Sequence, residues 1–220
     1  MDPDVALASA LAADLDRGFP TLVDAHASRC YTIAHRLLGV PSDAEEVAQD
    51  ALVRAYRALA GYEPDRIREL RLRPWLATIT VNLARNRRRR VADRRPASAL
   101  ELLVEAGREP AEASEAGPAA AAERREARGR LAAALLALPV TMRTAVVLRH
   151  VEGLSVAETA SALGRPEGTV KAQVARGLAL LRRHLAATDA DLPSEKPARL
   201  ASTLPASTQP ASISAKELTA

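Results

Sequence analysis

Apolar side chains recur at intervals of three and four residues in two separate parts of the chain, with charged side chains between them. The first part runs from residue 19 to residue 83. Its first helical stretch contains Phe19, Leu22, Val23, Cys30, Ile33, Ala34 and Leu37. This spacing predicts a helix that stops at Gly39 and Pro41.

Two more helices are predicted in this part of the chain. One begins at Ser42, because Ser42 and Glu45 have the spacing of a capping box, and its apolar side continues to Leu59. The next begins near Pro74, since proline suits the first turn of a helix. Residues 61–73 are expected to form a loop or short turn. Because no stretch alternates β-branched and polar residues, the pattern predicts an all-helical fold.

The second part of the pattern covers residues 125–185. Its first half contains Leu131, Leu135, Leu138, Met142, Val146 and Leu148, and Pro139 divides this run into two helices. Its second half has the signals of two helices joined by a tight turn. Ser155 and Glu158 form a capping box, Gly164 suits a left-handed helix end, and Pro166 suits the first turn of the next helix. That helix has an apolar stripe of Val170, Val174, Leu178, Leu181 and Leu185.

Residues 155–183 therefore predict a helix-turn-helix, in which the second helix enters the major groove of DNA. From residue 165 to residue 183 five basic side chains stand against Glu167, a net charge of +4. The ordinary alternative is a helical hairpin with a solvated basic face.

The pattern divides the chain into two small helical domains joined by a flexible linker, and the second is a four-helix domain. We expect an N-terminal lead-in, a first domain, a linker, a helix-turn-helix domain and a disordered tail. Their predicted bounds are 1–17, 18–95, 96–127, 128–187 and 188–220. The linker is rich in Ala, Glu, Pro and Gly, and the tail in Pro, Ser, Thr and Ala, and neither shows a sustained apolar period.

Charge is strongly segregated although the formal net charge is only +4. Residues 85–95 hold seven arginines and one aspartate, a net charge of +6, whereas residues 96–123 hold six glutamates and one arginine, a net charge of −5. The arginine run continues a predicted helix, so its side chains project along a rod and suit backbone phosphates. A solvated face or a targeting patch is the alternative.

Other chemistry is sparse. Cys30 is the one cysteine, which excludes an intrachain disulfide and fits a reducing compartment. The acidic N-terminus argues against a signal peptide, and no apolar run approaches the ~20 residues of a membrane span, so a cytoplasmic location without membrane insertion is expected. His26 and His35 are expected to be at the surface or partly buried. No metal site or cofactor is expected, because the histidines lack ligand partners in spacing.

An enzyme is also disfavoured. A nuclease needs clustered carboxylates for metal ions or a nucleophile with a base. The carboxylates between Asp43 and Asp50 lie on one helix, and no second cluster can be placed near them. The acid in the first turn suits the helix dipole. Asp50 is not explained in this way, so a contact surface for a basic partner helix is an alternative.

Several of these segments resemble the extracytoplasmic-function (ECF) group of sigma factors in the sigma-70 family. They are Ser42–Leu59 (SDAEEVAQDALVRAYRAL), Pro74–Asn86 (PWLATITVNLARN), Leu138–Pro139 and Gly168–Lys171 (GTVK). The resemblance covers about residues 19–95 and 128–186. It implies a promoter-recognition factor with no catalytic activity, whose first domain grips the clamp helices of RNA polymerase core and opens the −10 element, and whose second binds the −35 element. It also implies an anti-sigma factor as a further partner.

The resemblance assigns three sets of residues. The set facing polymerase core is Asp43, Glu46, Gln49, Asp50 and Arg54. The set facing −10 DNA is Trp75, Asn82, Arg85, Asn86 and Arg88, although the default role of Trp75 is a core anchor. The set facing −35 DNA is Glu167, Thr169, Lys171, Gln173 and Arg176.

Two departures from the family pattern bear on these assignments. Ala172 and Gln173 stand where the family commonly has Ser and Arg, so one phosphate contact is lost or moved and Gln173 is placed to read an adenine edge. The loop at residues 61–73, which in the family captures a flipped base, lacks the usual aromatic pattern. An alternative function is a two-domain helix-turn-helix regulator with a ligand-sensing first domain.

Overall fold

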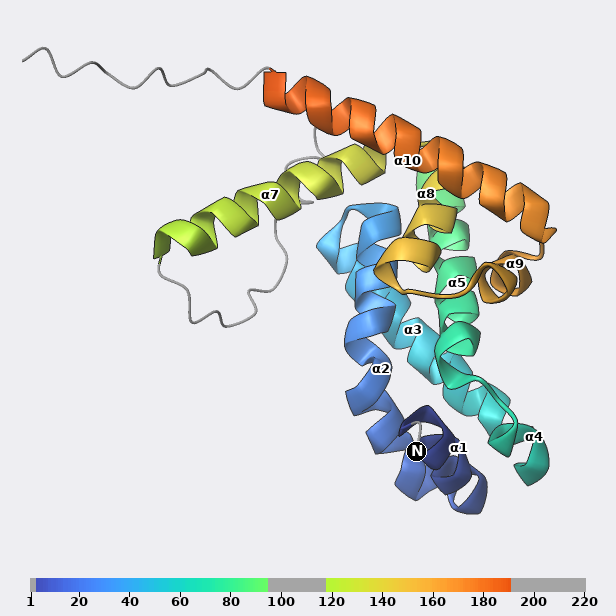
Figure 1. Ribbon diagram of the computed structural model, residues 1–220. Helices are drawn as coiled ribbons and strands as arrows, with labels where there is room; N and C mark the ends of the chain where they lie inside the picture. Colours follow the sequence, from blue (N-terminus) through green and yellow to red (C-terminus); the bar gives the residue numbers. More distant parts are fainter. Residues whose placement is uncertain (1–2, 95–117, 191–220) are drawn as a thin grey trace, which may run out of the picture.

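The computed structural model describes residues 3–94 and 118–190, and every regular element within these two ranges is a helix (Figure 1). The first range contains α1 (Pro3–Ala13), α2 (Leu15–Leu38), α3 (Pro41–Leu59), α4 (Pro64–Arg68) and α5 (Leu72–Arg94). The second contains α7 (Pro118–Ala137), α8 (Val140–Val146), the π-helix η1 (Val147–Val151), α9 (Val156–Leu163) and α10 (Glu167–Ala190). The prediction of an all-helical fold is confirmed for these residues.

The first domain is built on α2, α3 and α5, which pack against one another along their apolar sides. Residues 3–17 of the predicted lead-in contain α1 and the start of α2. α1 buries Leu7, Ala8 and Leu11 against α2 and α4, at the end of the molecule opposite α10 (Figure 1). Within the predicted loop at residues 61–73, the short helix α4 buries Ile67 in the same core.

The second domain packs α10 across α7 and α8. The two helices approach each other tightly at Gly177 of α10, where an added Cβ would lie 2.7 Å from Cγ2 of Val146. Leu135, Leu138 and Leu181 are buried around this crossing. Since the contact leaves no room for a side chain, the glycine sets how near α10 lies to α8.

The local signals of the helix-turn-helix are confirmed. Ser155 Oγ accepts a hydrogen bond from the Glu158 backbone N–H at 3.1 Å, and Glu158 Oε2 accepts one from the Ser155 N–H at 2.7 Å. Gly164 ends α9 in the left-handed conformation, with φ of 60°. Pro166 lies one residue before the first residue of α10, so the prediction that it is inside the helix is wrong by one position.

Three other local predictions differ from the structure. α3 begins at Pro41 with Val40 as its N-cap, and no side chain caps it, so the predicted capping box at Ser42 is wrong. His26 and His35 are 4% and 2% exposed, not at the surface, and Asp4 of α1 lies beside His26, with Oδ1 3.4 Å from its Nε2. Residues 118–127, predicted as linker, form the first half of α7. The rest of the predicted linker and the tail from residue 191 lie outside the described residues.

The two domains share one apolar core. Val147, Leu148, Leu154 and Ala162 of the second domain are buried together with Ile33, Leu37, Val47 and Val81 of the first. α9 lies along α5, and η1 lies beside α2 (Figure 1). Within the described residues the second domain is therefore docked on the first.

Candidate nucleic-acid and protein-binding surfaces

α5 presents polar side chains to solvent because its apolar positions face the core. Val81, Leu83 and Ala84 are buried, whereas Asn82 and Arg85 between and beside them are exposed. Asn86 and Arg88 are also exposed. The predicted −10 set thus forms one polar face, with the exception of Trp75. That side chain is half-buried against Tyr62, with ring centroids 6.3 Å apart, as expected for a core anchor.

Arg87, in the middle of the arginine run, binds the start of α3. Its Nε and Nη2 donate to Oδ1 of Asp43 at 3.0 and 2.6 Å, and its Nη1 donates to Oε1 of Glu46 at 2.8 Å. The hydrogen bond to Asp43 raises the pKa of Arg87. Two carboxylates of the predicted polymerase-facing set are therefore engaged within the first domain, joining α3 to α5.

The other three members of that set lie on the outer side of α3. Gln49, Asp50 and Arg54 are exposed. Gln49 also lines a groove of about 640 Å³ between α2 and α3, together with Glu45 and, from α7, Arg128. Half-buried Leu52 and Tyr31 give this groove an apolar floor. It is an amphipathic surface of the kind that a helix of another protein can contact.

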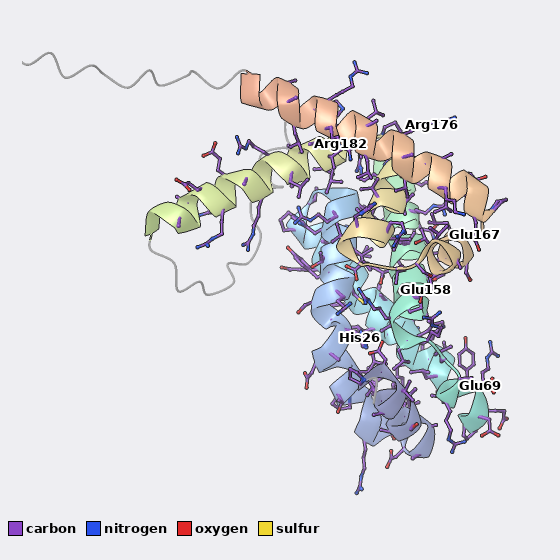
Figure 2. The ribbon with its side chains drawn as sticks, viewed as in Figure 1. His26, Glu69, Glu158, Glu167, Arg176 and Arg182 are labelled. Atoms are coloured by element: carbon purple, nitrogen blue, oxygen red, sulfur yellow. The ribbon has the colours of Figure 1, made fainter. Side chains whose placement is uncertain are left out.

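The recognition-helix side chains fall into two groups. Glu167, Thr169, Lys171 and Arg176 are exposed on α10, which crosses the end of the molecule opposite α1 (Figure 2). Gln173 is half-buried, and its Oε1 is buried without a hydrogen-bond partner. Gln173 lines a cavity of about 70 Å³ together with Arg85 and Arg165.

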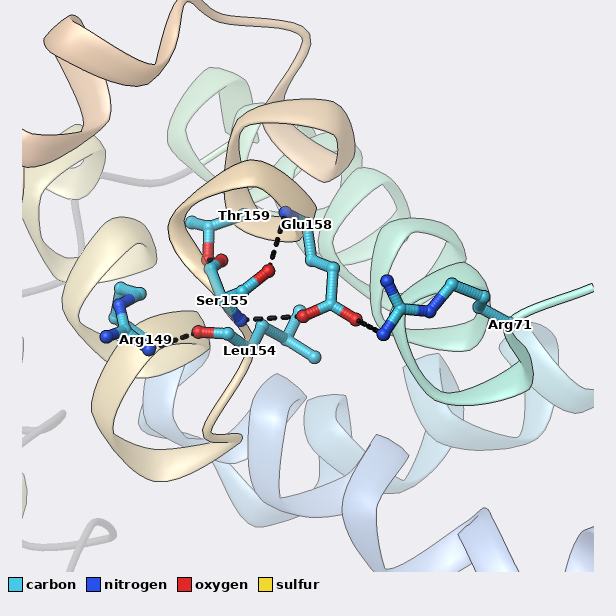
Figure 3. A network of polar contacts seen from close by, with 6 residues as sticks. All are labelled: Arg71, Arg149, Leu154, Ser155, Glu158 and Thr159. Carbon is cyan, nitrogen blue, oxygen red and sulfur yellow. Dashed lines mark hydrogen bonds and ion pairs between the residues drawn. The ribbon is translucent and has the colours of Figure 1, made fainter. Parts of the chain in front are cut away.

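Glu158 forms an ion pair with the first domain in addition to capping α9. Its Oε1 lies 2.7 Å from Nη2 of Arg71, which precedes α5, while its Oε2 caps α9 (Figure 3). The hydrogen bond with Ser155 lowers the pKa of Glu158, and the positive charge of Arg71 adds to this effect. On the other side of the turn, Arg149 donates to the Leu154 carbonyl. The start of α9 is thus fixed to both domains.

Two further side chains of the second domain, Arg143 and Glu152, contact the first domain. Arg143 is buried and donates to the carbonyls of Leu37 at 2.8 Å and Leu138 at 3.1 Å, and also to that of Leu136. Burial lowers its pKa to about 10, and Arg88 contributes. Buried Glu152 has its Oε2 4.0 Å from Nη1 of Arg29, and burial raises its pKa. Arg143 lies within α8 and Glu152 directly follows η1, and the apolar spacing of these stretches gives no sign of either contact.

Residues 3–94 and 118–190 offer no candidate metal site and no candidate membrane span. No group of three or more His, Cys, Asp or Glu side chains there could hold a metal ion. No helix in this part of the chain has the length and apolar character needed to cross a bilayer.

The chain matches two known family models. Residues 22–95 match the family model for sigma-70 region 2, and residues 128–181 match the model for sigma-70 region 4. The chain belongs to the sigma-70 family. It is 37% identical over 166 residues to the ECF RNA polymerase sigma factor SigE of Mycolicibacterium smegmatis, covering 75% of this chain and 60% of that protein. It is 31% identical to the ECF sigma factor SigW of Bacillus subtilis, covering 76% and 88%. These relatives are ECF sigma factors, as the sequence resemblance predicted.

Solved structures agree with this assignment. The sigma-family chain is similar to CnrH in its complex with the cytosolic domain of CnrY, with 30% identity, a TM-score of 0.57, and coverage of 86% of this chain and 99% of that one. It shares its fold with the sigma factor RpoE in complex with the anti-sigma factor NepR from Bartonella quintana, at 21% identity and a TM-score of 0.56, covering 76% and 96%.

Proposed function

We propose that this ECF sigma factor acts as a promoter-specificity subunit of RNA polymerase, without catalytic activity of its own, in the cytoplasm. The observation that carries the proposal is the presence of two exposed polar surfaces in the order of regions 2 and 4: the Asn82–Arg88 side of α5 and the Lys171–Arg176 side of α10. Each surface alone offers few base contacts. When one polymerase holds both surfaces, binding of the first raises the effective concentration of the second at its own DNA element, so the two weak contacts reinforce each other.

The first domain is assigned to the −10 element. Asn82, Arg85, Asn86 and Arg88 lie on one exposed face of α5, where arginine forks suit phosphates and asparagine suits base edges. In the connection between α3 and α5, Tyr62 offers an aromatic ring for stacking on an unpaired base of the −10 element. Cζ of Arg66 lies 3.8 Å from the centroid of this ring. The second domain is assigned to the −35 element through Glu167, Thr169, Lys171 and Arg176, with Gln173 as a base reader.

The polymerase surface is assigned to the outer side of α3. Gln49, Asp50 and Arg54 are exposed there, beside the groove between α2 and α3. Asp43 and Glu46 are given an indirect role, because their carboxylates hold Arg87 and so fix the angle between α3 and α5. A protein that binds the free sigma factor is a further expected partner, since CnrH is bound to the cytosolic domain of CnrY in its solved structure.

Reconstituted transcription with polymerase core on a promoter library tests this proposal. The expected result is initiation from a subset of templates that share two separated sequence elements. Transcription that is unchanged by adding the chain, or tight sequence-specific DNA binding without polymerase that responds to a small molecule, would favour the ligand-sensing regulator instead.

A pull-down with polymerase core tests the α3 surface. Asp50→Lys should weaken capture of the core, because it reverses a charge in the centre of the exposed face. Asp24→Lys is the matched control, since it makes the same charge change at an exposed position of α2. Equal capture of both variants would remove Asp50 from the interface.

A further inference from the structure

A cavity of about 470 Å³ lies where α1, α2, residues 68–74 and the start of α9 meet. Three of its lining residues, His26, Glu69 and Glu158, come from different segments of the chain and are labelled in Figure 2. The volume is within the range of small-molecule sites, about 300–1,000 Å³. None of the residues assigned above to polymerase core, the −10 element or the −35 element lines this cavity.

Arginine is the most frequent side chain of the cavity wall. Arg29, Arg68, Arg71 and Arg73 line it, together with three carboxylates, so the lining carries a net charge of +1. We call it the arginine cavity. A guanidinium group is planar and donates two parallel hydrogen bonds to two oxygens of one phosphate, which makes arginine well suited to phosphate binding.

Two of the three carboxylates are paired within the protein. Oε1 of Glu158 lies 2.7 Å from Nη2 of Arg71, and its Oε2 caps α9 (Figure 3). Oδ1 of Asp4 lies 3.4 Å from Nε2 of His26. The third, Glu69, is exposed at the end of α4. The carboxylates therefore offset only part of the positive charge that an anion in the cavity would meet.

Arg73 has a donor that the described residues leave without a partner. Its Nε is buried and makes no hydrogen bond within these residues. Its Nη2 lies close to Gly153, where an added Cβ would be 3.3 Å away. Because a buried donor without an acceptor costs free energy, an acceptor placed in the cavity beside Arg73 would recover that cost.

Arg29 and Arg73 act on the same groups from two different helices. Burial lowers the pKa of His26; the charge of Asp4 opposes this shift, and the charges of both arginines add to it. Burial raises the pKa of Glu152, and the charges of both arginines oppose that shift. Guanidinium groups from α2 and α5 thus lie near one another, in an arrangement that can hold one phosphate from two sides.

We propose that the arginine cavity binds a phosphate group, with Arg73 and Arg29 as its main donors. No Phe, Tyr or Trp is among the described residues that line it, so it offers no ring of these types for stacking on a base, and the phosphate itself is what the cavity recognises. The phosphate belongs either to a small phosphorylated molecule or to the backbone of a DNA strand. The proposal goes beyond promoter recognition and does not depend on it.

Titration of the full chain with tripolyphosphate tests the proposal, with isothermal titration calorimetry to measure Kd and circular dichroism to measure Tm. At a concentration of about one hundred times Kd, Tm should rise by at least about 5 °C, because a ligand that binds only the folded chain stabilises it. Sodium chloride at the same ionic strength controls for screening of surface charges. The absence of both binding heat and a rise in Tm would overturn the proposal.

Arg73→Met should weaken tripolyphosphate binding at least tenfold. Without the anion its Tm should change little, because the Nε that it removes has no partner among the described residues. Arg89→Met is the matched control, since it removes the same charge from an exposed position of the same helix. If Arg89→Met weakens binding as much as Arg73→Met does, the anion binds the arginine run and the proposal is wrong.

A second variant covers the case in which circular dichroism shows that Arg73→Met has lost helix. Arg29→Gln then replaces it, since the Arg29 side chain is 45% exposed and its loss disturbs the core less. It should also weaken tripolyphosphate binding at least tenfold. An affinity equal to that of the natural chain would refute the role given to the arginine cavity.

A short single-stranded oligonucleotide distinguishes the two sources of phosphate. If Arg73→Met weakens binding of both the oligonucleotide and tripolyphosphate, the cavity holds a phosphate of a DNA strand. If it weakens binding of tripolyphosphate alone, the ligand is a small phosphorylated molecule. If it weakens neither, the proposal is wrong. Failure of the proposed function is separate, because polymerase core would then initiate nowhere specific while tripolyphosphate binding and its loss in Arg73→Met stayed the same.

Discussion

Arg87 of α5 should stabilise the first domain by binding two carboxylates at the start of α3. Its guanidinium donates twice to Asp43 and once to Glu46, and the side chains are 30%, 17% and 55% exposed, respectively. Replacing Arg87 by alanine leaves the half-buried Asp43 carboxylate without this partner. A charge-assisted hydrogen bond contributes about 1.5–3 kcal/mol, and an exposed ion pair such as the one to Glu46 contributes less than about 1 kcal/mol.

We therefore expect Arg87→Ala to lower the free energy of unfolding by about 2 kcal/mol, after allowing for the solvent exposure of the arginine. In a chain of this size that corresponds to a fall in Tm of roughly 4–8 °C. Thermal unfolding followed by circular dichroism measures it. Arg89→Ala is the matched control, because it removes the same charge from an exposed position of the same helix. We expect it to change stability by less than about 0.5 kcal/mol.

The double variant Asp43→Ala, Arg87→Ala identifies the cause. If the two residues act through each other, their losses are far from additive, with a coupling of about 1 kcal/mol or more. Equal Tm losses for Arg87→Ala and Arg89→Ala, or strictly additive losses in the double variant, would refute the reasoning that Asp43 acts within the domain.

Three further predictions concern packing, protonation and the buried arginine. Gly177→Ala should cost about 1–3 kcal/mol in urea unfolding, because its Cβ would overlap α8, whereas Gly129→Ala, with open space around its Cβ, should cost nothing. Burial lowers the pKa of His26, so the free energy of unfolding should fall as the pH drops below 6.5 towards that lowered pKa. His26→Gln should make the free energy of unfolding less dependent on pH in this range, whereas His150→Gln, at an exposed position, should not. An equal pH dependence in the two variants would contradict the role given to His26. Arg143→Met should lower the free energy of unfolding by at least about 2 kcal/mol, since it leaves buried carbonyls without a hydrogen-bond donor. Arg143→Lys should be almost as unstable, because an ammonium group lacks the forked donors of a guanidinium. Stability of Arg143→Lys equal to that of the natural chain would show that charge alone matters.

The parts of the fold that sequence could predict are those fixed by neighbours in the chain. The capping box of Ser155 and Glu158 and the left-handed Gly164 are interactions within a few residues, so their spacing was sufficient. The same reasoning failed at Ser42, because Pro41 starts α3 one residue earlier and takes the first-turn position. Two adequate start signals lay side by side, and spacing alone could not rank them.

What sequence could not predict depends on contacts between distant segments. His26 is buried because α1 and the segment before α5 cover it, and its nearest acid is Asp4, with Nε2 3.4 Å from Oδ1. Arg87 looked like its neighbours in an arginine run, and only the angle at which α5 crosses α3 selects it for Asp43. Exposed residues of the candidate surfaces were easier to predict, because the spacing of apolar residues along a helix separates its buried side from its exposed side.

The docking of the two domains was beyond sequence reasoning for a similar reason. Ala162 and Leu154 follow apolar patterns that would equally fit a core within their own domain. Whether such a side chain is covered by its own helices or by those of another domain depends on the path of the intervening chain. The predicted bounds of the two domains stay a prediction.

The π-helix Val147–Val151 contains one residue more than an α-helical turn would. The bond from the Glu152 N–H to the Val147 carbonyl, at 2.9 Å, closes this longer turn. Removing a single residue here would let the turn close with ordinary α-helical hydrogen bonds, so the chain beyond it would nearly keep its direction. The same deletion within α10 would instead rotate the side chains beyond it by about 100° around that helix. A change of one residue in length should therefore be better tolerated at the π-helix than in the recognition helix.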